Sequence, residues 1–228
     1  MLKRKILSLY ILLLIIISMY SNIINALNLP LIDTTITIDA GHGGRDSGTT
    51  YKEILEKDIN LEISKKLAKE LTKNGAITYM IRTRDEDLSS IYDSKKKRGD
   101  LYRRLLLIKK NQSDLYLSIH INWYQDPSYK GAEVLYNPIN QQNKLLATFI
   151  MKQFKKDLNS NRNIDTTDLY MYRNTTTPGV LIECGYLSNY QERNLLITSN
   201  YQEKLAKSIT TGVIDYLKYT SGVKNIYF

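Results

Sequence analysis

Residues Ile36–Gly44 read ITIDAGHGG, and this stretch decides the fold. The residues from Thr35 to Asp39 alternate polar and apolar side chains, which is typical of a strand. The glycines that follow predict an abrupt turn with His42 at the point of the break. A second stretch, Leu115–Asn122 (LYLSIHIN), has the same design, a strand with His120 near its end. These are the only two histidines in the chain, so a metal ion shared between them is the first hypothesis.

Length and composition indicate one ordinary globular domain with appendages, since the chain has 228 residues and a near-average apolar content. The net charge of +9 comes partly from the N-terminus and partly from the cationic run Lys95–Arg98. Such a charge suits an acidic polymer: a cell wall, a membrane surface or nucleic acid. No zinc-finger spacing or aromatic nucleic-acid signature is present, so we expect no nucleic-acid partner. The single cysteine, Cys184, excludes an internal disulfide framework and a multi-cysteine metal site.

The N-terminal residues have the layout of a targeting segment. Three cations precede a charge-free apolar run, Ile6–Tyr20, which predicts a secretory signal peptide or an N-terminal membrane anchor over residues 1–26. Ile24 is not a small residue, which weakens the case for cleavage after Ala26. Residues 6–32 carry no charged side chain, so an uncleaved membrane anchor is the alternative. In both cases we expect the body of the protein to be secreted across the cytoplasmic membrane or anchored to its outer face. Membrane contact is expected only through this segment.

The rest of the chain alternates strand-like and helix-like patterns. Strands are expected at 35–39, 76–82, 115–120, 132–136, 169–172 and 180–184, and helices at 53–73, 99–111, 140–158 and around 205–217. Ser188 with Gln191, and Ser199 with Gln202, fit capping boxes at helix starts. This alternation predicts a single α/β domain over residues 33–220, a largely parallel twisted sheet flanked by helices, with the N-terminal hydrophobic segment outside the fold.

Three candidate functional residues fall at the ends of predicted strands: His42, His120 and Glu183. Ligands bind at the carboxyl ends of strands in such sheets, which is the spatial argument for a site. Two imidazoles and one carboxylate around an open position make a hydrolytic zinc centre, so the third ligand must be an acid. Glu56 shares a helical arc with apolar residues and should point inward, but Glu53 is an open rival.

Four motifs in order resemble one family: IDAGHGG, LEKDINLEI, DLYLSIHIN and VLIECGYLSN, at residues 38–44, 55–63, 114–122 and 180–189. They are similar to motifs of the zinc-dependent N-acetylmuramoyl-L-alanine amidases of the amidase-3 type, and the resemblance spans roughly residues 35–217. It implies zinc ligands at His42, Glu56 and His120, and a catalytic glutamate at Glu183. It also implies hydrolysis of the amide between N-acetylmuramic acid and L-alanine in peptidoglycan, the expected partner.

The compact form with an N-terminal hydrophobic segment most resembles the spore-cortex, germination-specific amidases of endospore formers. That resemblance implies removal of stem peptides ahead of muramic-lactam formation, in the forespore envelope. Because no wall-binding repeats are found, the membrane segment or a protein partner is expected to direct the enzyme to its substrate. The alternatives are a non-catalytic wall-binding or regulatory domain of the same fold, or another zinc hydrolase such as a glycan deacetylase.

Several nearby residues have alternative interpretations. Asp39 could hydrogen-bond a metal-binding imidazole or cap the turn. Cys184 should face away from Glu183, because side chains alternate along a strand, and is expected in the core. Trp123 and Tyr124, just past His120, could line a groove.

Overall fold

A computed structural model describes residues 2–27 and 29–224 of the chain. The chain divides into two compact units, Met1–Pro30 and Leu31–Phe228. The first unit contains helix α1 (Leu2–Leu27), which covers the expected targeting segment. Among the helices that the structure describes, none combines the length and the apolar character needed to cross a membrane.

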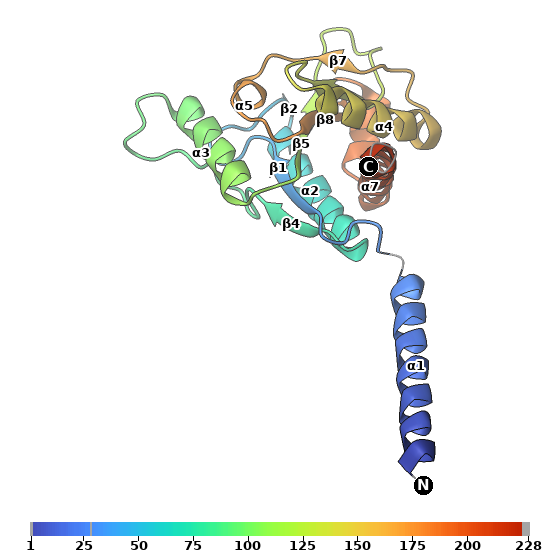
Figure 1. Ribbon diagram of the computed structural model, residues 1–228. Helices are drawn as coiled ribbons and strands as arrows, with labels where there is room; N and C mark the ends of the chain where they lie inside the picture. The colour runs from blue at the N-terminus through green and yellow to red at the C-terminus, as the bar shows by residue number, and fades with distance from the viewer. Residues whose placement is uncertain (1, 28, 225–228) are drawn as a thin grey trace. The chain divides into compact units, whose positions relative to one another are not determined.

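The second unit is built on a six-stranded sheet (Figure 1). In spatial order its strands are β4 (Ile77–Met80), β1 (Thr35–Ala40), β5 (Leu115–Asn122), β8 (Gly179–Tyr186), β6 (Glu133–Tyr136) and β7 (Asp165–Thr166). Only the β6–β8 pair is antiparallel, so the sheet is largely parallel, as the sequence predicts. A separate small hairpin, β2 (Thr50–Tyr51) with β3 (Ile54–Leu55), precedes the first helix of this unit.

Helices cover both faces of the sheet (Figure 1). The helices are α2 (Glu56–Lys73), α3 (Lys96–Lys110), α4 (Gln141–Leu158), α5 (Tyr170–Arg173), α6 (Tyr190–Leu196) and α7 (Ser199–Lys224). Helices α2, α4, α6 and α7 bury apolar side chains in one large cluster on the first face of the sheet. Helices α3 and α5 pack on the second face through a smaller cluster. The architecture is therefore three layers, as expected for an α/β domain.

The strands distribute their side chains between these two faces with a period of two. In β5, Leu117 and Ile119 belong to the large cluster, whereas Tyr116 belongs to the smaller one. Toward the carboxyl end of the sheet, polar side chains replace apolar ones on the second face. Cys184 is fully buried in the large cluster, so it faces away from Glu183, and its predicted place in the core is confirmed.

Three local predictions are wrong, and one short strand was not predicted. Residues 169–172 form most of the short helix α5 rather than a strand, because a four-residue apolar run carries no period that separates the two. Strand β7 is only two residues long, too short for a sequence signal. Asn189, not Ser188, caps α6 by accepting from the Glu192 amide. Ser199 is itself the first residue of α7, and the side chain of Gln202 donates to a carbonyl of the preceding turn.

Two buried arginines hold the backbone where β1 ends. Arg82 is 1% exposed and donates to the carbonyls of Ala40 and Gly41 at 2.8 and 3.0 Å. Arg104, on α3, is 2% exposed and donates to the carbonyls of Ala40 and His42 at 2.9 and 2.7 Å. Three successive carbonyls that leave the sheet are thereby satisfied, which fixes the turn that carries His42.

The charge of Arg104 is balanced by two carboxylates. It lies 2.6 Å from Asp39 and 2.7 Å from Asp100. Burial works to raise the pKa of Asp39, but the charge of Arg104 outweighs it with help from nearby groups, and the pKa falls below its usual value. Asp39 therefore stays ionised and depends on Arg104.

We expect Arg104→Met to lower the free energy of unfolding by about 3–5 kcal/mol, because it leaves Asp39 charged and unpaired in the interior. The matched control is Arg103→Met, which breaks a more exposed pair with Asp93 and should cost much less, because solvent screens exposed ion pairs. Urea unfolding followed by circular dichroism measures both. Equal losses in the two variants would contradict the role assigned to Arg104.

Candidate metal centre and active site

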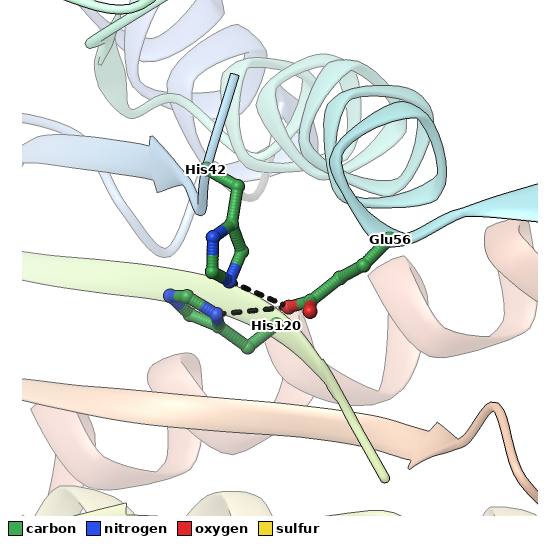
Figure 2. A group of neighbouring side chains, drawn as sticks. All are labelled: His42, Glu56 and His120. Atoms are coloured by element: carbon green, nitrogen blue, oxygen red, sulfur yellow. Dashed lines mark hydrogen bonds and ion pairs between the residues drawn. The ribbon is translucent and has the colours of Figure 1, made fainter. Parts of the chain in front are cut away.

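Three side chains from distant parts of the chain converge at the carboxyl end of the sheet (Figure 2). His42 lies in the turn after β1, Glu56 is the first residue of α2, and His120 lies in β5. Each offers one ligand atom, and these atoms all lie within 4.8 Å of one another. Within the described part of the chain, this is the group of donors whose arrangement could hold a metal ion.

Glu56 is the centre of this group. Its Oε1 lies 3.2 Å from His42 Nε2 and 3.0 Å from His120 Nδ1 (Figure 2). Two backbone amides hold the carboxylate: Ile121 donates to Oε1 at 3.1 Å and Thr49 donates to Oε2 at 2.7 Å. The β2–β3 hairpin delays the start of α2 to Glu56, which places this carboxylate at the helix N-terminus. Glu53, the rival from sequence, lies in the hairpin turn and is exposed.

The electrostatics of the group favour a cation. Burial works to raise the pKa of Glu56, but hydrogen bonds from His120 and His42 outweigh it, and the pKa falls far below the usual value. Burial likewise works to lower the pKa of His42, yet its hydrogen bond with Glu56 and the charge of that carboxylate raise the pKa overall. The carboxylate thus stabilises positive charge beside it. Two imidazoles and one carboxylate are also the donor set of hydrolytic zinc sites, so the residues fit that ion.

Asp46, which sequence reasoning missed, lies behind one imidazole. Its Oδ2 is 3.0 Å from His42 Nδ1, which leaves Nε2 directed toward Glu56. Carboxylates commonly orient metal-binding histidines in this way. Asp39 does not take that role, contrary to one of the two expectations for it: it accepts from Arg104 and from Ser118. Nor does it cap the turn, so both expectations for Asp39 are wrong. The only sequence signal for Asp46 is its place four residues after His42.

The glycines of the turn after β1 are required for different physical reasons. A Cβ on Gly41 would lie 2.3 Å from the His120 ring, so only glycine lets that imidazole pack over the turn. Gly43 has a φ of 132°, which side chains rarely adopt. His42 itself has a φ of 61°, an unusual value for a residue with a side chain. The turn is therefore held in place by the arginine hydrogen bonds rather than by intrinsic preference.

Glu183 lies beside this group, on β8. Its Cα partner across the sheet is His120. Its Oε2 is buried and makes no hydrogen bond to the described residues. Burial raises the pKa of Glu183 well above the usual value, and the charges of Glu56 and Glu133 add to the rise. A carboxyl group with a raised pKa next to a metal-binding cluster is suited to accept and return a proton.

A pocket of about 290 Å³ opens on the second face of the sheet, between α3 and α5. Its walls include His42, His120 and Glu183, and Lys97 of the cationic run lies along it as well. A substrate in the pocket would therefore reach both imidazoles and Glu183, whereas Glu56 is not among the residues that line it. The charged lining is mixed, because Asp46 and Asp100 line the pocket together with Lys97, whose Nζ lies 3.6 Å from Asp46 Oδ2.

Comparison with known proteins identifies the family of the chain. Residues 36–215 match the model of the N-acetylmuramoyl-L-alanine amidase family. The chain is 36% identical over 194 residues to a germination-specific N-acetylmuramoyl-L-alanine amidase of Bacillus subtilis, covering 83% of this chain and 82% of that protein. Among solved structures, it is similar to the CwlD amidase of Clostridioides difficile in complex with the GerS lipoprotein. The TM-score is 0.79 and the identity 35%, over 82% of this chain and 100% of that one. An N-acetylmuramoyl-L-alanine amidase from Clostridium difficile 630 gives a TM-score of 0.73 and 32% identity over 81% of this chain and 97% of that one.

The family match and these similarities show that the chain belongs to the N-acetylmuramoyl-L-alanine amidases, hydrolases that act on an amide bond.

Proposed function

We propose that this amidase removes stem peptides from peptidoglycan with a zinc ion held by His42, Glu56 and His120, and with Glu183 as the proton carrier. The observation that supports the proposal most directly is the convergence of three ligand atoms within 4.8 Å beside a buried carboxyl group. The bond cleaved joins the lactyl group of N-acetylmuramic acid to the nitrogen of L-alanine.

In this proposal, different side chains carry out different steps of the hydrolysis. Zinc, when bound, lowers the pKa of a water to about 7 and polarises a carbonyl. Glu183 accepts the proton of the attacking water and returns it to the departing alanine nitrogen, so the amine leaves neutral. Asp46 keeps His42 in one orientation during this cycle, and Arg104 keeps its backbone in place. Lys97, an exposed side chain at the pocket wall 3.6 Å from Asp46, is the cation that a carboxylate of the stem peptide would meet.

The biological substrate that we propose is spore-cortex peptidoglycan, ahead of muramic-lactam formation. The similarity to a germination-specific amidase supports this choice over vegetative wall. We propose that the segment over residues 1–26 acts as a signal peptide or anchor and brings the domain at 33–220 to the outer face of the membrane. A protein partner is the second proposed means of targeting, because the structure of a similar amidase is that of a complex with a lipoprotein.

Replacing Glu56 tests the metal centre. We expect Glu56→Ala to lower zinc affinity by more than about 100-fold, since loss of an outer partner alone costs up to that much. The matched control is Glu53→Ala, an exposed acid three residues away, which should keep its zinc. Metal content after dialysis, measured by mass spectrometry, decides between them. Zinc loss in the Glu53 variant instead would contradict the ligand set.

Replacing Glu183 tests the proton carrier. We expect Glu183→Gln to lower kcat by about 100- to 10,000-fold while bound zinc is unchanged, because the amide cannot accept the proton. The assay follows release of peptides that begin with L-alanine from purified cortex. Release of acetate instead of peptide would favour a deacetylase, and release of neither by the zinc-loaded wild type would favour a non-catalytic domain.

The raised pKa of Glu183 also predicts a pH-dependent stability. Below the unfolded value of 4.5 the carboxyl is protonated in both states, and as the pH rises toward the folded pKa the unfolded chain releases its proton first. The metal-free wild type should therefore lose stability as the pH rises, relative to Glu183→Gln. Chemical unfolding in the presence of a chelator should show equal stabilities near about pH 4 and a more stable variant near about pH 8. A difference independent of pH would refute the assignment.

A further inference from the structure

A second cluster lies next to Glu183 on the same face of the sheet. Glu133, on β6, is the Cα partner of Glu183, so the two side chains share a face about 5 Å apart. Glu133 is 5% exposed and sits at the centre of a hydrogen-bond network. It accepts from Asn122 at 2.9 Å, from Tyr186 at 2.5 Å and from Arg162 at 2.9 Å. The buried charge of Glu133 is thus paired with that of Arg162.

This network holds a set of aromatic rings. The guanidinium of Arg162 lies 5.4 Å from the ring centre of Tyr129 and 5.7 Å from that of Tyr186. Tyr129 in turn lies against Tyr124, with ring centres 4.1 Å apart and planes inclined by 34°. The loop that carries both rings is tied down at each end: Tyr124 N donates to Ser188 Oγ, and Gly131 N donates to a carboxylate of α6. We call Tyr124, Tyr129 and Arg162 the tyrosine platform.

The platform is ordered and yet open to solvent. Tyr124 is 46% exposed and Tyr129 is 37% exposed, although both rings are fixed by stacking and by the Glu133–Arg162 pair. Two nitrogens of Arg162 are taken up by Glu133, which leaves Nη1 without a hydrogen bond to the described residues. A rigid aromatic surface with a free donor at its edge is suited to a flat ligand that has an apolar face and a polar rim.

We propose that the tyrosine platform binds a sugar ring of the glycan strand, next to the muramic acid whose peptide is cleaved. This inference rests on the proposed function and narrows its substrate to a glycan chain rather than a single muramoyl peptide. The C–H face of a pyranose meets the negative face of an aromatic ring, and Arg162 Nη1 donates to a hydroxyl group at the sugar edge. The position supports this assignment: Glu183 lines the pocket between α3 and α5, and its Cα partner on β6 is Glu133, which holds Arg162 of the platform.

The experiment compares two substrates with the full-length protein: a peptide-bearing tetrasaccharide of peptidoglycan, and a muramoyl peptide with one sugar. Tyr129→Ala should raise KM for the tetrasaccharide by about tenfold with kcat unchanged, and leave KM for the single-sugar substrate unchanged. Tyr129→Phe keeps the stacking face and should behave as the wild type does. Tyr92→Ala, which removes a ring that is 90% exposed on a distant loop, is the matched control and should leave both constants unchanged.

The outcomes separate this inference from the proposed function. An unchanged KM for the tetrasaccharide, or equal increases for both substrates, would overturn the platform as a glycan subsite. If the wild type cleaves neither substrate, the proposed function fails, and calorimetric binding of the tetrasaccharide to the wild type and to Tyr129→Ala still tests the platform. Equal binding by the two proteins would then overturn it, whereas weaker binding by the variant would support it.

Discussion

The structure depends on how the chain leaves β1. A strand that ends in mid-sheet exposes carbonyls that no neighbouring strand can satisfy, and here those carbonyls belong to Ala40, Gly41 and His42. Arg82, two residues after the end of β4, and Arg104, on helix α3, donate to them. Planar guanidinium groups with several donors suit this task, because one side chain reaches two carbonyls at once. The imidazole of His42 is therefore placed by buried charges rather than by the backbone's own preference.

Burying the charges of Arg82 and Arg104 has an electrostatic cost. The two charges are compensated in different ways, one by carboxylates and the other by backbone carbonyls. Arg104 has two carboxylates within hydrogen-bond distance. Arg82 donates to four backbone carbonyls, and among the described residues no acid forms an ion pair with it. Burial lowers the pKa of Arg82, and the nearby charge of Arg104 lowers it further. Backbone carbonyl dipoles take the place of a counter-ion there, so the turn is held without another carboxylate beside His42, Glu56 and His120.

Two glutamates at the site show how environment assigns different roles to one residue type. Glu56 faces two imidazoles and two backbone amides, which hold it ionised. Glu183 faces an apolar strand environment and other acids, which favour its protonated form. A pair of carboxyl groups with pKa values displaced in opposite directions separates a charge-holding role from a proton-carrying one. The same row across the sheet continues to Glu133, whose pairing with Arg162 supports the tyrosine platform.

The sequence by itself was sufficient for the α/β class, the largely parallel sheet, the burial of Cys184 and the candidate residues His42, Glu56, His120 and Glu183. These follow from short-range periodicity, glycine turns and the four motifs, which depend on neighbours along the chain. Only the tertiary structure revealed that Asp39 pairs with Arg104, that Asp46 lies behind His42, and that Glu133 pairs with Arg162 of the platform. No local sequence pattern specifies these contacts. An acid in a turn or a tyrosine in a loop gives the same local sequence signal whichever residue it contacts in the folded protein. Interactions between neighbours along the chain determine the helices and strands. Long-range packing, including the pairing of buried charges, determines which side chains come into contact.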